Sequence, residues 1–336
     1  MNIHLNLSDN SYDIIVERGI LKESGKHLNL DRRVLIVTDS GVPECYSKTV
    51  AAQCKNPVIC TVKSGEGSKS LEVFGELLQK MLDNNFSRKD CVVAVGGGVV
   101  GDLSGFAASA YMRGIDFYNI PTTLLSQIDS SIGGKTAINF GGVKNIVGAF
   151  YQPKKVLIDP ELLNTLPERQ ISNGLAEAIK MALTSDKELF DIFENKDIKE
   201  SIDEIIVRSL NIKKAVVEQD EKETNLRKIL NFGHTVGHGI ESSHELYHGE
   251  CVALGMIPMC DEKIRQRVTE VLKKCNLYNV PEFDWNKIKE AAFHDKKADG
   301  DSVTVTTVAD VGTYELKTMK CDEVIEMAKC CLIEGK

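Results

Sequence analysis

The chain has 336 residues, of which 42% are hydrophobic and 27% charged, and its formal net charge is −8. Because a single core usually stops growing near roughly 250–300 residues, we expect two domains. The composition is that of an ordinary globular protein, and the acidic balance argues against a nucleic-acid binder or a polybasic membrane sensor.

The first part of the chain alternates predicted strands with predicted helices. Apolar and polar residues alternate over 3–7 and 12–16, which predicts an antiparallel hairpin. Residues 71–81 repeat apolar side chains every three or four positions, as a helix does. Short apolar runs typical of buried strands lie at 34–37, 58–62 and 92–95. This order predicts parallel βαβ units, so we expect an α/β domain over 1–160.

The second part of the chain, 161–336, reads as mainly helical. The apolar periodicity predicts helices over 172–194, 202–219, 227–244, 250–265 and 285–293. A late hairpin is expected from strands at 303–308 and 314–316, followed by a terminal helix from Asp322.

Two general features bear on the compartment. Ten cysteines are scattered without any Cys-x-x-Cys pair, which favours core thiols in a reducing environment. No apolar run approaches ~18 residues, and the N-terminus lacks a signal-peptide pattern. We therefore expect a cytoplasmic protein.

A glycine-rich turn, 96–102, follows a predicted strand and opens a helix. Its Gly-x-Gly-x-x-Gly spacing lets a backbone approach a pyrophosphate at a helix N-terminus, although such glycines can also form a simple turn. Asp39 ends an earlier strand, where a carboxylate can bind a ribose or cap a turn. The loop 64–69 could hold an adenosine or be a solvated loop. Gly133-Gly134-Lys135-Thr136 is not a P-loop because Asp129 replaces the first glycine, but Lys135 still suits a phosphate.

Acidic and histidine residues suggest a metal. Glu177 and Lys180 lie three residues apart on one helix face, either as a surface pair or, as we favour, on a buried functional face. His234 and His238 lie one helical turn apart, and spacing alone favours this pair as metal ligands over His234 with His248. A structural role is the alternative for any single histidine. A metal site and a phosphate-binding turn together suggest an enzyme that uses a nucleotide cofactor.

Taken together, these motifs resemble the 3-dehydroquinate synthase family. The resemblance extends from about residue 31 to 300 and rests on the order of the segments 96–102, 111–114, 121–125, 129–136, 144–145, 174–180, 230–238 and 248–250. It implies an N-terminal Rossmann-like α/β domain and a helical C-terminal domain (the dehydroquinate synthase-like fold), with the active site in the cleft. It also implies NAD⁺, one Zn²⁺ or Co²⁺ ion and a homodimer.

The resemblance implies a role for each site residue. It makes Glu177, His234 and His248 the metal ligands, in place of the His234/His238 pair, and turns His238 toward substrate. Lys213 and Arg227 match the positions that bind the substrate carboxylate. Positions that bind the substrate phosphate are matched by Lys135, Asn145, Lys296 (or Lys297) and Arg113, the last reaching across a dimer interface. Positions that line the sugar hydroxyls are matched by Asp129, Lys180 and Asn231. Cofactor contacts are matched by Asp39, Glu66, Lys69, Gly97, Gly98, Val99, Val100, Gly101, Asp102, Thr122, Thr123, Lys135, Lys144 and Thr165.

The implied reaction converts 3-deoxy-D-arabino-heptulosonate 7-phosphate into 3-dehydroquinate and phosphate. Transient oxidation at C5 acidifies the C6 hydrogen, phosphate is eliminated, the hydride returns, and the opened ring closes as a carbocycle. Related sugar phosphate cyclases are disfavoured because their substrates lack the carboxylate that Lys213 and Arg227 would bind. An amino-dehydroquinate synthase, a polyol dehydrogenase related to glycerol dehydrogenase and a non-catalytic NAD-binding regulator are rival functions. Two departures from the family pattern, a shorter 241–248 segment and an altered turn at 140–143, concern loop geometry.

Overall fold

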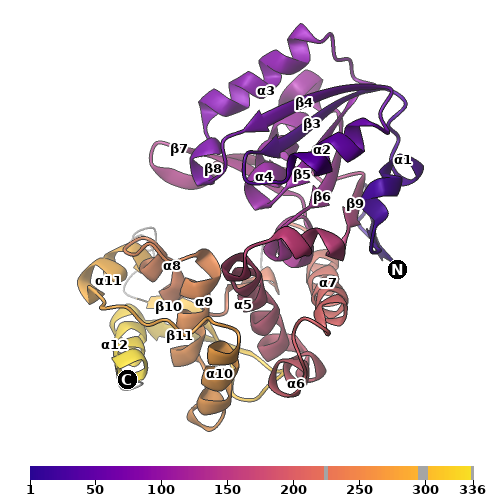
Figure 1. The fold of residues 1–336 in the computed structure, drawn as a ribbon. Helices are drawn as coiled ribbons and strands as arrows, with labels where there is room; N and C mark the ends of the chain where they lie inside the picture. The colour runs from indigo at the N-terminus through magenta and orange to yellow at the C-terminus, as the bar shows by residue number, and fades with distance from the viewer. Residues whose placement is uncertain (223–225, 294–301, 334–336) are drawn as a thin grey trace. The chain divides into compact units, whose positions relative to one another are not determined.

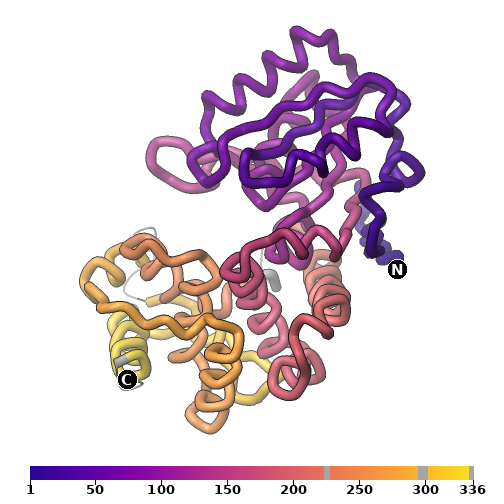
Figure 2. The backbone as a smooth tube through the Cα atoms, in the orientation of Figure 1, coloured from indigo at the N-terminus to yellow at the C-terminus, as the bar shows by residue number. Residues whose placement is uncertain are grey.

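The computed structural model describes residues 1–222, 226–293 and 302–333, with the side chains of Leu226, Arg227 and Ile333 excepted. The chain divides into two compact units, Met1–Leu166 and Pro167–Lys336 (Figures 1 and 2). The boundary predicted at residue 160 falls at the start of the 3-10 helix η5 (Pro160–Thr165). No helix in the described ranges is long and apolar enough to cross a membrane.

The first unit is built on a seven-stranded sheet. Its strand order is β1-β2-β9-β6-β5-β3-β4, with β1 and β2 antiparallel and every other neighbouring pair parallel. The predicted N-terminal hairpin is confirmed, with Ile3 opposite Ile14. The strands are β1 (Asn2–Leu5), β2 (Tyr12–Val16), β3 (Arg33–Asp39), β4 (Asn56–Val62), β5 (Cys91–Gly96), β6 (Asp116–Pro121) and β9 (Lys155–Ile158).

Helices cover both faces of this sheet, because its central strands are apolar on both sides. Leu35 and Val37 of β3 pack with α3 (Leu71–Asp83) and α4 (Gly98–Ala110). The alternate residues Val34 and Ile36 pack on the other face with α2 (Glu44–Ala51). The short helices of this unit are η1 (Ile20–Glu23), α1 (Ser24–His27), η2 (Glu66–Ser68), η3 (Tyr111–Arg113) and the π-helical turn η4 (Ser126–Ser130). The α/β class predicted for this unit is confirmed.

A separate hairpin, β7 (Lys135–Phe140) with β8 (Val143–Phe150), was missed by the sequence analysis. Gly141 and Gly142 turn the chain at φ values of 60° and 82°, which only glycine adopts without strain. Most of β8 is exposed, so its side chains do not show the apolar alternation by which strands are recognised.

The second unit is mainly helical, as predicted (Figure 1). The predicted helices at α7 and α11, the late hairpin and the terminal helix are confirmed. Its elements are α5 (Glu168–Ser185), α6 (Lys187–Asn195), α7 (Ile202–Gln219), η6 (Leu226–Asn231), α8 (His234–Glu241), α9 (His248–Met256), η7 (Ile257–Met259), α10 (Glu262–Lys274), α11 (Trp285–Phe293), β10 (Ser302–Thr307), β11 (Glu315–Lys320) and α12 (Cys321–Ile333).

Three long predicted helices are wrong in extent, because each contains a helix terminus that apolar periodicity does not reveal. The helix predicted over 172–194 ends at Asp186, whose side chain caps the next helix by accepting from the Leu189 backbone N–H. The helix predicted over 227–244 is interrupted at Gly233, which has a φ of 78°. The helix predicted over 250–265 stops in η7, which contains Pro258.

Candidate functional site

Glu177 and Lys180 form a buried ion pair on α5. Their side chains are 1% and 2% exposed, and the Lys180 ammonium donates to Glu177 Oε2. The prediction of a buried face, in preference to a surface pair, is confirmed. A buried charged pair of this kind is costly to assemble, so its presence points to a role other than stability.

Two imidazoles from other helices meet the second oxygen of Glu177. His234 Nε2 on α8 lies 3.6 Å from Glu177 Oε1, and His248 Nε2 on α9 lies 3.5 Å from the same atom. These three residues form one of two groups in the described part of the chain that could hold a metal. The other group is His238, Glu241 and His248, and neither group contains His234 together with His238. The ligand pair suggested by spacing alone is therefore not supported.

The surroundings of these three residues fit a divalent cation. Glu177 Oε1 is buried and accepts no hydrogen bond from any described residue. His234 Nδ1 lies 3.1 Å from the Phe232 carbonyl oxygen, and His248 Nδ1 lies 3.0 Å from Glu241 Oε2. Both rings therefore point Nε2 at the unpartnered carboxylate oxygen, while Nδ1 is held from behind. One oxygen and two nitrogens are a donor set typical of a catalytic metal with open positions.

The pKa values of these three side chains are shifted in different ways. Burial raises the pKa of Glu177, but Lys180 and the two imidazoles outweigh it and hold that pKa well below its usual range. Burial, reinforced by Lys180, lowers the pKa of His234 to about 3, so its ring is neutral. Burial alone would lower the pKa of His248, yet Glu177 and Glu241 raise it to about 9. A cation that binds here must displace the His248 proton.

Close helix packing brings His234 and His248 together. A side chain at Gly255 of α9 would lie 2.0 Å from the Gly233 carbonyl oxygen, and one at Gly237 of α8 would lie 3.0 Å from the Cys251 carbonyl oxygen. The two backbones therefore touch. The glycines of Gly233-His234-Thr235-Val236-Gly237 serve this contact, which explains their spacing.

Other residues predicted to contact substrate are scattered over the second unit. Lys213 is buried on α7, whereas Asn231 and His238 are exposed. The His238 ring lies 5.2 Å from the His234 ring and 5.9 Å from the His248 ring. The Arg227 side chain and all of Lys296 and Lys297 lie outside the described residues.

In the first unit, the glycine-rich turn joins β5 to α4 as predicted. A side chain at Gly96 would lie 2.6 Å from Val100, one at Gly97 3.0 Å from Thr123, and one at Gly98 3.0 Å from Ser130. The N-cap residue of α4 is Gly97, which has no side chain to accept from the backbone N–H groups of the first turn. Such a helix start is suited to a pyrophosphate.

A buried lysine lies beside this turn. Lys69 is 4% exposed, its Nζ lies 2.7 Å from Asp102 Oδ2 and 3.7 Å from Glu66 Oε1, and it donates to Asn145 Oδ1. Burial raises the pKa of Asp102 to about 6, even though Lys69 opposes the shift. The structure thus gathers two predicted cofactor residues, Glu66 and Asp102, and one predicted phosphate residue, Asn145, around the ammonium of a third predicted cofactor residue, Lys69.

The remaining predicted residues of the first unit lie in separate elements, outside the contacts of Lys69 described above. Asp39 Oδ1 accepts from the Gly41 backbone N–H at 2.7 Å, so this carboxylate caps a turn. Thr165 Oγ1 lies 2.8 Å from the Tyr46 hydroxyl, and Thr123 Oγ1 accepts from the Ser126 N–H. The Thr122 backbone N–H donates to the Gly96 carbonyl. Arg113, Lys135 and Lys144 are exposed, and Asp129 is half-buried in η4.

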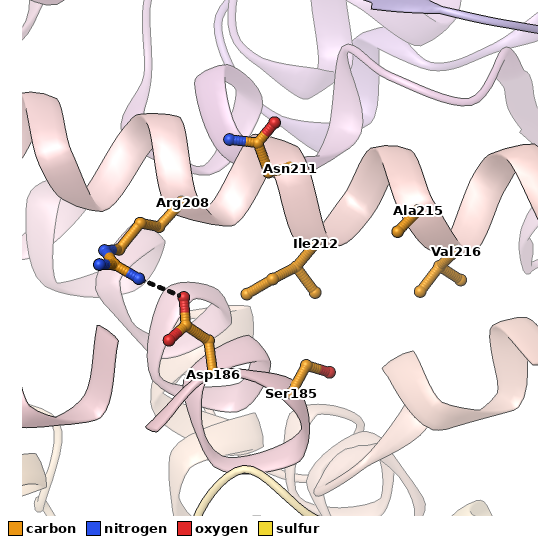
Figure 3. A pocket seen from close by; sticks show the side chains of 7 residues that line it. All are labelled: Ser185, Asp186, Arg208, Asn211, Ile212, Ala215 and Val216. Carbon is orange, nitrogen blue, oxygen red and sulfur yellow. Dashed lines mark hydrogen bonds and ion pairs between the residues drawn. The ribbon is translucent and has the colours of Figure 1, made fainter. Parts of the chain in front are cut away.

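A pocket of about 380 Å³ lies along α7 but contains none of the predicted residues. Its walls are Ser185, Asp186, Arg208, Asn211, Ile212, Ala215 and Val216 (Figure 3). Arg208 points at Asp186, 2.8 Å away, and also pairs with Glu188 and Glu204. Because this cation is already neutralised, the pocket is not suited to an anionic substrate.

Three residues near the histidines, Glu241, Arg169 and Glu250, have no role predicted from the sequence. Glu241 lies seven residues after His234, which places both on one helix face and was a readable signal. Arg169 forms a bidentate pair with Glu250, 81 residues away, and nothing local in the sequence announces it.

The chain is similar in sequence to a family of known proteins. Residues 59–173 match the family described as 3-dehydroquinate synthase N-terminal, and residues 174–298 match 3-dehydroquinate synthase C-terminal. A 3-dehydroquinate synthase of Alkaliphilus metalliredigens is 42% identical over 90% of this chain and 91% of its own. One from Streptococcus thermophilus is 39% identical over 97% of this chain and 99% of its own.

A solved structure is also similar. The 2-epi-5-epi-valiolone synthase of Streptomyces hygroscopicus, with NAD⁺ and Zn²⁺ bound, superposes with a TM-score of 0.88 at 29% identity, over 98% of this chain and 99% of that one. The fold predicted from the motifs is confirmed by this likeness. The chain belongs to the 3-dehydroquinate synthase family.

Proposed function

We propose that this chain converts 3-deoxy-D-arabino-heptulosonate 7-phosphate into 3-dehydroquinate and phosphate, as a lyase of aromatic biosynthesis. The observation that carries the proposal is the convergence of His234 and His248 on one oxygen of Glu177 that accepts no hydrogen bond from the described residues, in a member of this family. A relative named for this activity is 42% identical to the chain, whereas a related cyclase, the 2-epi-5-epi-valiolone synthase, is 29% identical. The higher identity favours the dehydroquinate synthase activity.

The cofactors follow from the same residues. A divalent ion, Zn²⁺ or Co²⁺, held by Glu177, His234 and His248 would supply a Lewis acid for hydroxyl oxygens, and NAD⁺ at the start of α4 would supply the transient hydride acceptor. Lys180 keeps Glu177 ionised, which is the form that binds a cation. Glu241 holds Nδ1 of His248 and so fixes the ring orientation.

We assign the substrate contacts by charge. Lys213, a buried ammonium, and Arg227 would bind the carboxylate end, where fixed cations hold an anion in one orientation. Lys135, Asn145, Arg113 and Lys296 would bind the phosphate. Asp129, Lys180 and Asn231 would accept or donate to the ring hydroxyls, and the exposed His238 imidazole could hold a proton beside them.

We assign NAD⁺ to the first unit. The backbone of 97–102 would bind the pyrophosphate, and Asp39 the ribose. The positions Glu66, Lys69, Thr122, Thr123, Lys135, Lys144 and Thr165 complete the set. Lys69 holds Asp102 of α4 and Asn145 of β8 at fixed places, so these two elements are tied together by one ammonium.

We also propose a homodimer in the cytoplasm. Phe140, Val143, Ile146 and Phe150 are exposed on the β7–β8 hairpin, and exposed large apolar side chains are common at interfaces. The left-handed Arg113 backbone, with a φ of 67°, marks a special conformation that a partner subunit could require. None of the ten cysteines, all of which lie within the described residues, forms a disulfide, which suits a reducing compartment. Light scattering of the purified chain tests the dimer; a monomer at micromolar concentration would contradict it.

A coupled assay tests the activity. Phosphate should be released from the heptulosonate phosphate while the absorbance at 340 nm stays level, because NAD⁺ is regenerated in each turnover. Accumulation of NADH with glycerol, and no phosphate release, would instead identify a polyol dehydrogenase. A chelator should stop turnover while NAD⁺ still binds, and full activity in metal-free protein would contradict the metal assignment.

A further inference from the structure

One face of α5 contacts the first turn of α9 residue by residue. Arg169, Asn173 and Glu177 are spaced by four positions, so they lie on the same face of α5. They meet three consecutive residues of α9 in reverse order. Arg169 pairs with Glu250, Asn173 accepts from the Gly249 backbone N–H at 2.6 Å, and Glu177 lies opposite His248. The pair of predicted metal ligands, Glu177 and His248, is therefore one of three neighbouring residue pairs that join α5 to α9.

The middle step sets how closely the helices approach. A side chain at Gly249 would lie 2.1 Å from the Asn173 carbonyl oxygen, so the α9 backbone rests on the α5 backbone there. This contact limits approach, but it does not stop α9 from rotating or lifting away. The hydrogen bond from the Gly249 N–H to Asn173 Oδ1 holds this one point, and a second attractive contact beside it would fix the rotation of α9 that places His248.

Glu250 and Arg169 provide that contact. Arg169 Nε and Nη2 lie 2.8 Å from the two oxygens of Glu250, which is a bidentate pair. Glu250 Oε2 also accepts from the Tyr247 backbone N–H at 2.7 Å, and the Arg169 guanidinium lies 4.1 Å from the Tyr247 ring centre. The residues on both sides of His248 and Gly249 are thus fixed to the start of α5.

We propose that Arg169 is a positioning residue for the metal site. Arg169 holds Glu250 and Tyr247 at the start of α9 and thereby keeps His248 against Glu177. This inference rests on the proposed metal site. Arg169 itself is half exposed and touches none of the three ligands. Its effect should therefore appear as a change in metal affinity.

The chain offers a matched control in Arg267. Arg267 on α10 forms a bidentate pair with Glu194, also at 2.8 and 2.8 Å, and its guanidinium lies 5.6 Å from the Phe190 ring centre. Its side chain is 44% exposed, against 50% for Arg169. The two arginines therefore resemble each other in geometry and exposure, but only Arg169 contacts the helix that carries His248.

The experiment measures the binding of Co²⁺ alone to the full chain, by competition with a chelator and by the visible absorption of the bound ion. Arg169→Ala should weaken Co²⁺ binding by about 10–100-fold and alter the absorption, as loss of an outer-shell partner does. Arg169→Lys, which keeps the charge but not the bidentate geometry, should give an intermediate affinity. Arg267→Ala should lower the melting temperature. It should leave Co²⁺ affinity within about twofold of wild type, because Arg267 does not support a predicted metal ligand.

Two outcomes would overturn the proposal. If Arg169→Ala binds Co²⁺ as wild type does, or if Arg267→Ala weakens binding equally, Arg169 has no specific effect on the metal. Should the alanine variant not fold, Arg169→Gln applies the same test, and wild-type affinity in it is decisive against the proposal. Failure of the wild-type chain to bind Co²⁺ would instead refute the metal site of the proposed function, and this inference with it.

Discussion

The two units each contain a buried lysine paired with a carboxylate, and the pKa values of the two carboxylates shift in opposite directions. In the second unit, Lys180 and Glu177 are three residues apart on one helix, and two imidazoles lie beside the carboxylate. In the first, Lys69 and Asp102 come from segments 33 residues apart, and amide and carboxylate groups surround them. The pKa of Glu177 is held low, whereas burial raises that of Asp102 to about 6. Lys180 and the two imidazoles thus outweigh burial and keep Glu177 ionised, whereas burial outweighs Lys69 and makes Asp102 easier to protonate.

The largest expected effect breaks the pair in the second unit. Glu177→Gln removes the carboxylate of the proposed ligand set, so metal binding should fall by more than the roughly 100-fold typical of an outer-shell change, and turnover should be lost. NAD⁺ affinity should stay near that of wild type. Metal content after dialysis checks this prediction, and a variant that retains one ion per chain would contradict it.

The next effect breaks the pair in the first unit. Lys69→Met removes the ammonium that holds Asp102 and Asn145, so NAD⁺ binding should weaken by about tenfold, or ~1.4 kcal/mol. Co²⁺ affinity should not change. Titration calorimetry with NAD⁺ measures the loss, with the exposed Lys80→Ala on α3 as the control. Equal NAD⁺ affinity in Lys69→Met would remove Lys69 from the cofactor assignment.

The raised pKa of Asp102 predicts a pH dependence of stability. Its folded pKa of about 6 exceeds the reference value of 3.8, so the folded state binds a proton that the unfolded state has already released between about pH 4 and 6. This stabilising contribution is full below pH 4 and is lost as pH rises through 6. The free energy of unfolding of wild type, minus that of Asp102→Asn, should therefore fall by up to roughly 3 kcal/mol between pH 4 and 7. Urea denaturation at both pH values measures it, and a constant difference would show that the pKa is not raised.

The last prediction compares two glycines, of which Gly75 should give the smallest effect. Gly249→Ala would push α9 off α5, and we expect a loss of about 1–3 kcal/mol in stability together with weaker metal binding. Gly75 on α3 has open space around its Cα, so Gly75→Ala should raise stability by roughly 0.5–1 kcal/mol. Thermal melts of both variants check the signs. A stable Gly249→Ala with unchanged Co²⁺ affinity would show that the helices can separate at no cost.

The sequence predicted the α/β unit well because its strands are buried on both faces, and continuous apolar runs record that burial directly. It predicted the helical unit less well, since the ends at Asp186, Gly233 and Pro258 depend on single residues within an unbroken periodicity. It missed the exposed β7–β8 hairpin for the opposite reason, namely that no buried face imposes a pattern there.

The metal group shows the limit of local spacing more sharply. His234 and His238 are adjacent on a helix face, yet the structure groups His234 with Glu177, 57 residues earlier, and with His248 of the next helix. Only the resemblance to a family suggested that set, because packing between helices, and not spacing within one, brings its members together. The ligand roles themselves stay predictions until a metal is measured.

The backbone contact between α8 and α9 has a consequence for the choice of ion. Gly233, Gly237 and Gly255 join the two histidine-bearing helices by direct backbone contact, without an intervening layer of side chains. The spacing of the two imidazoles is consequently set by helix packing. Zinc and cobalt should therefore replace one another in the folded chain, at a rate set by dissociation of the ion and with no unfolding step.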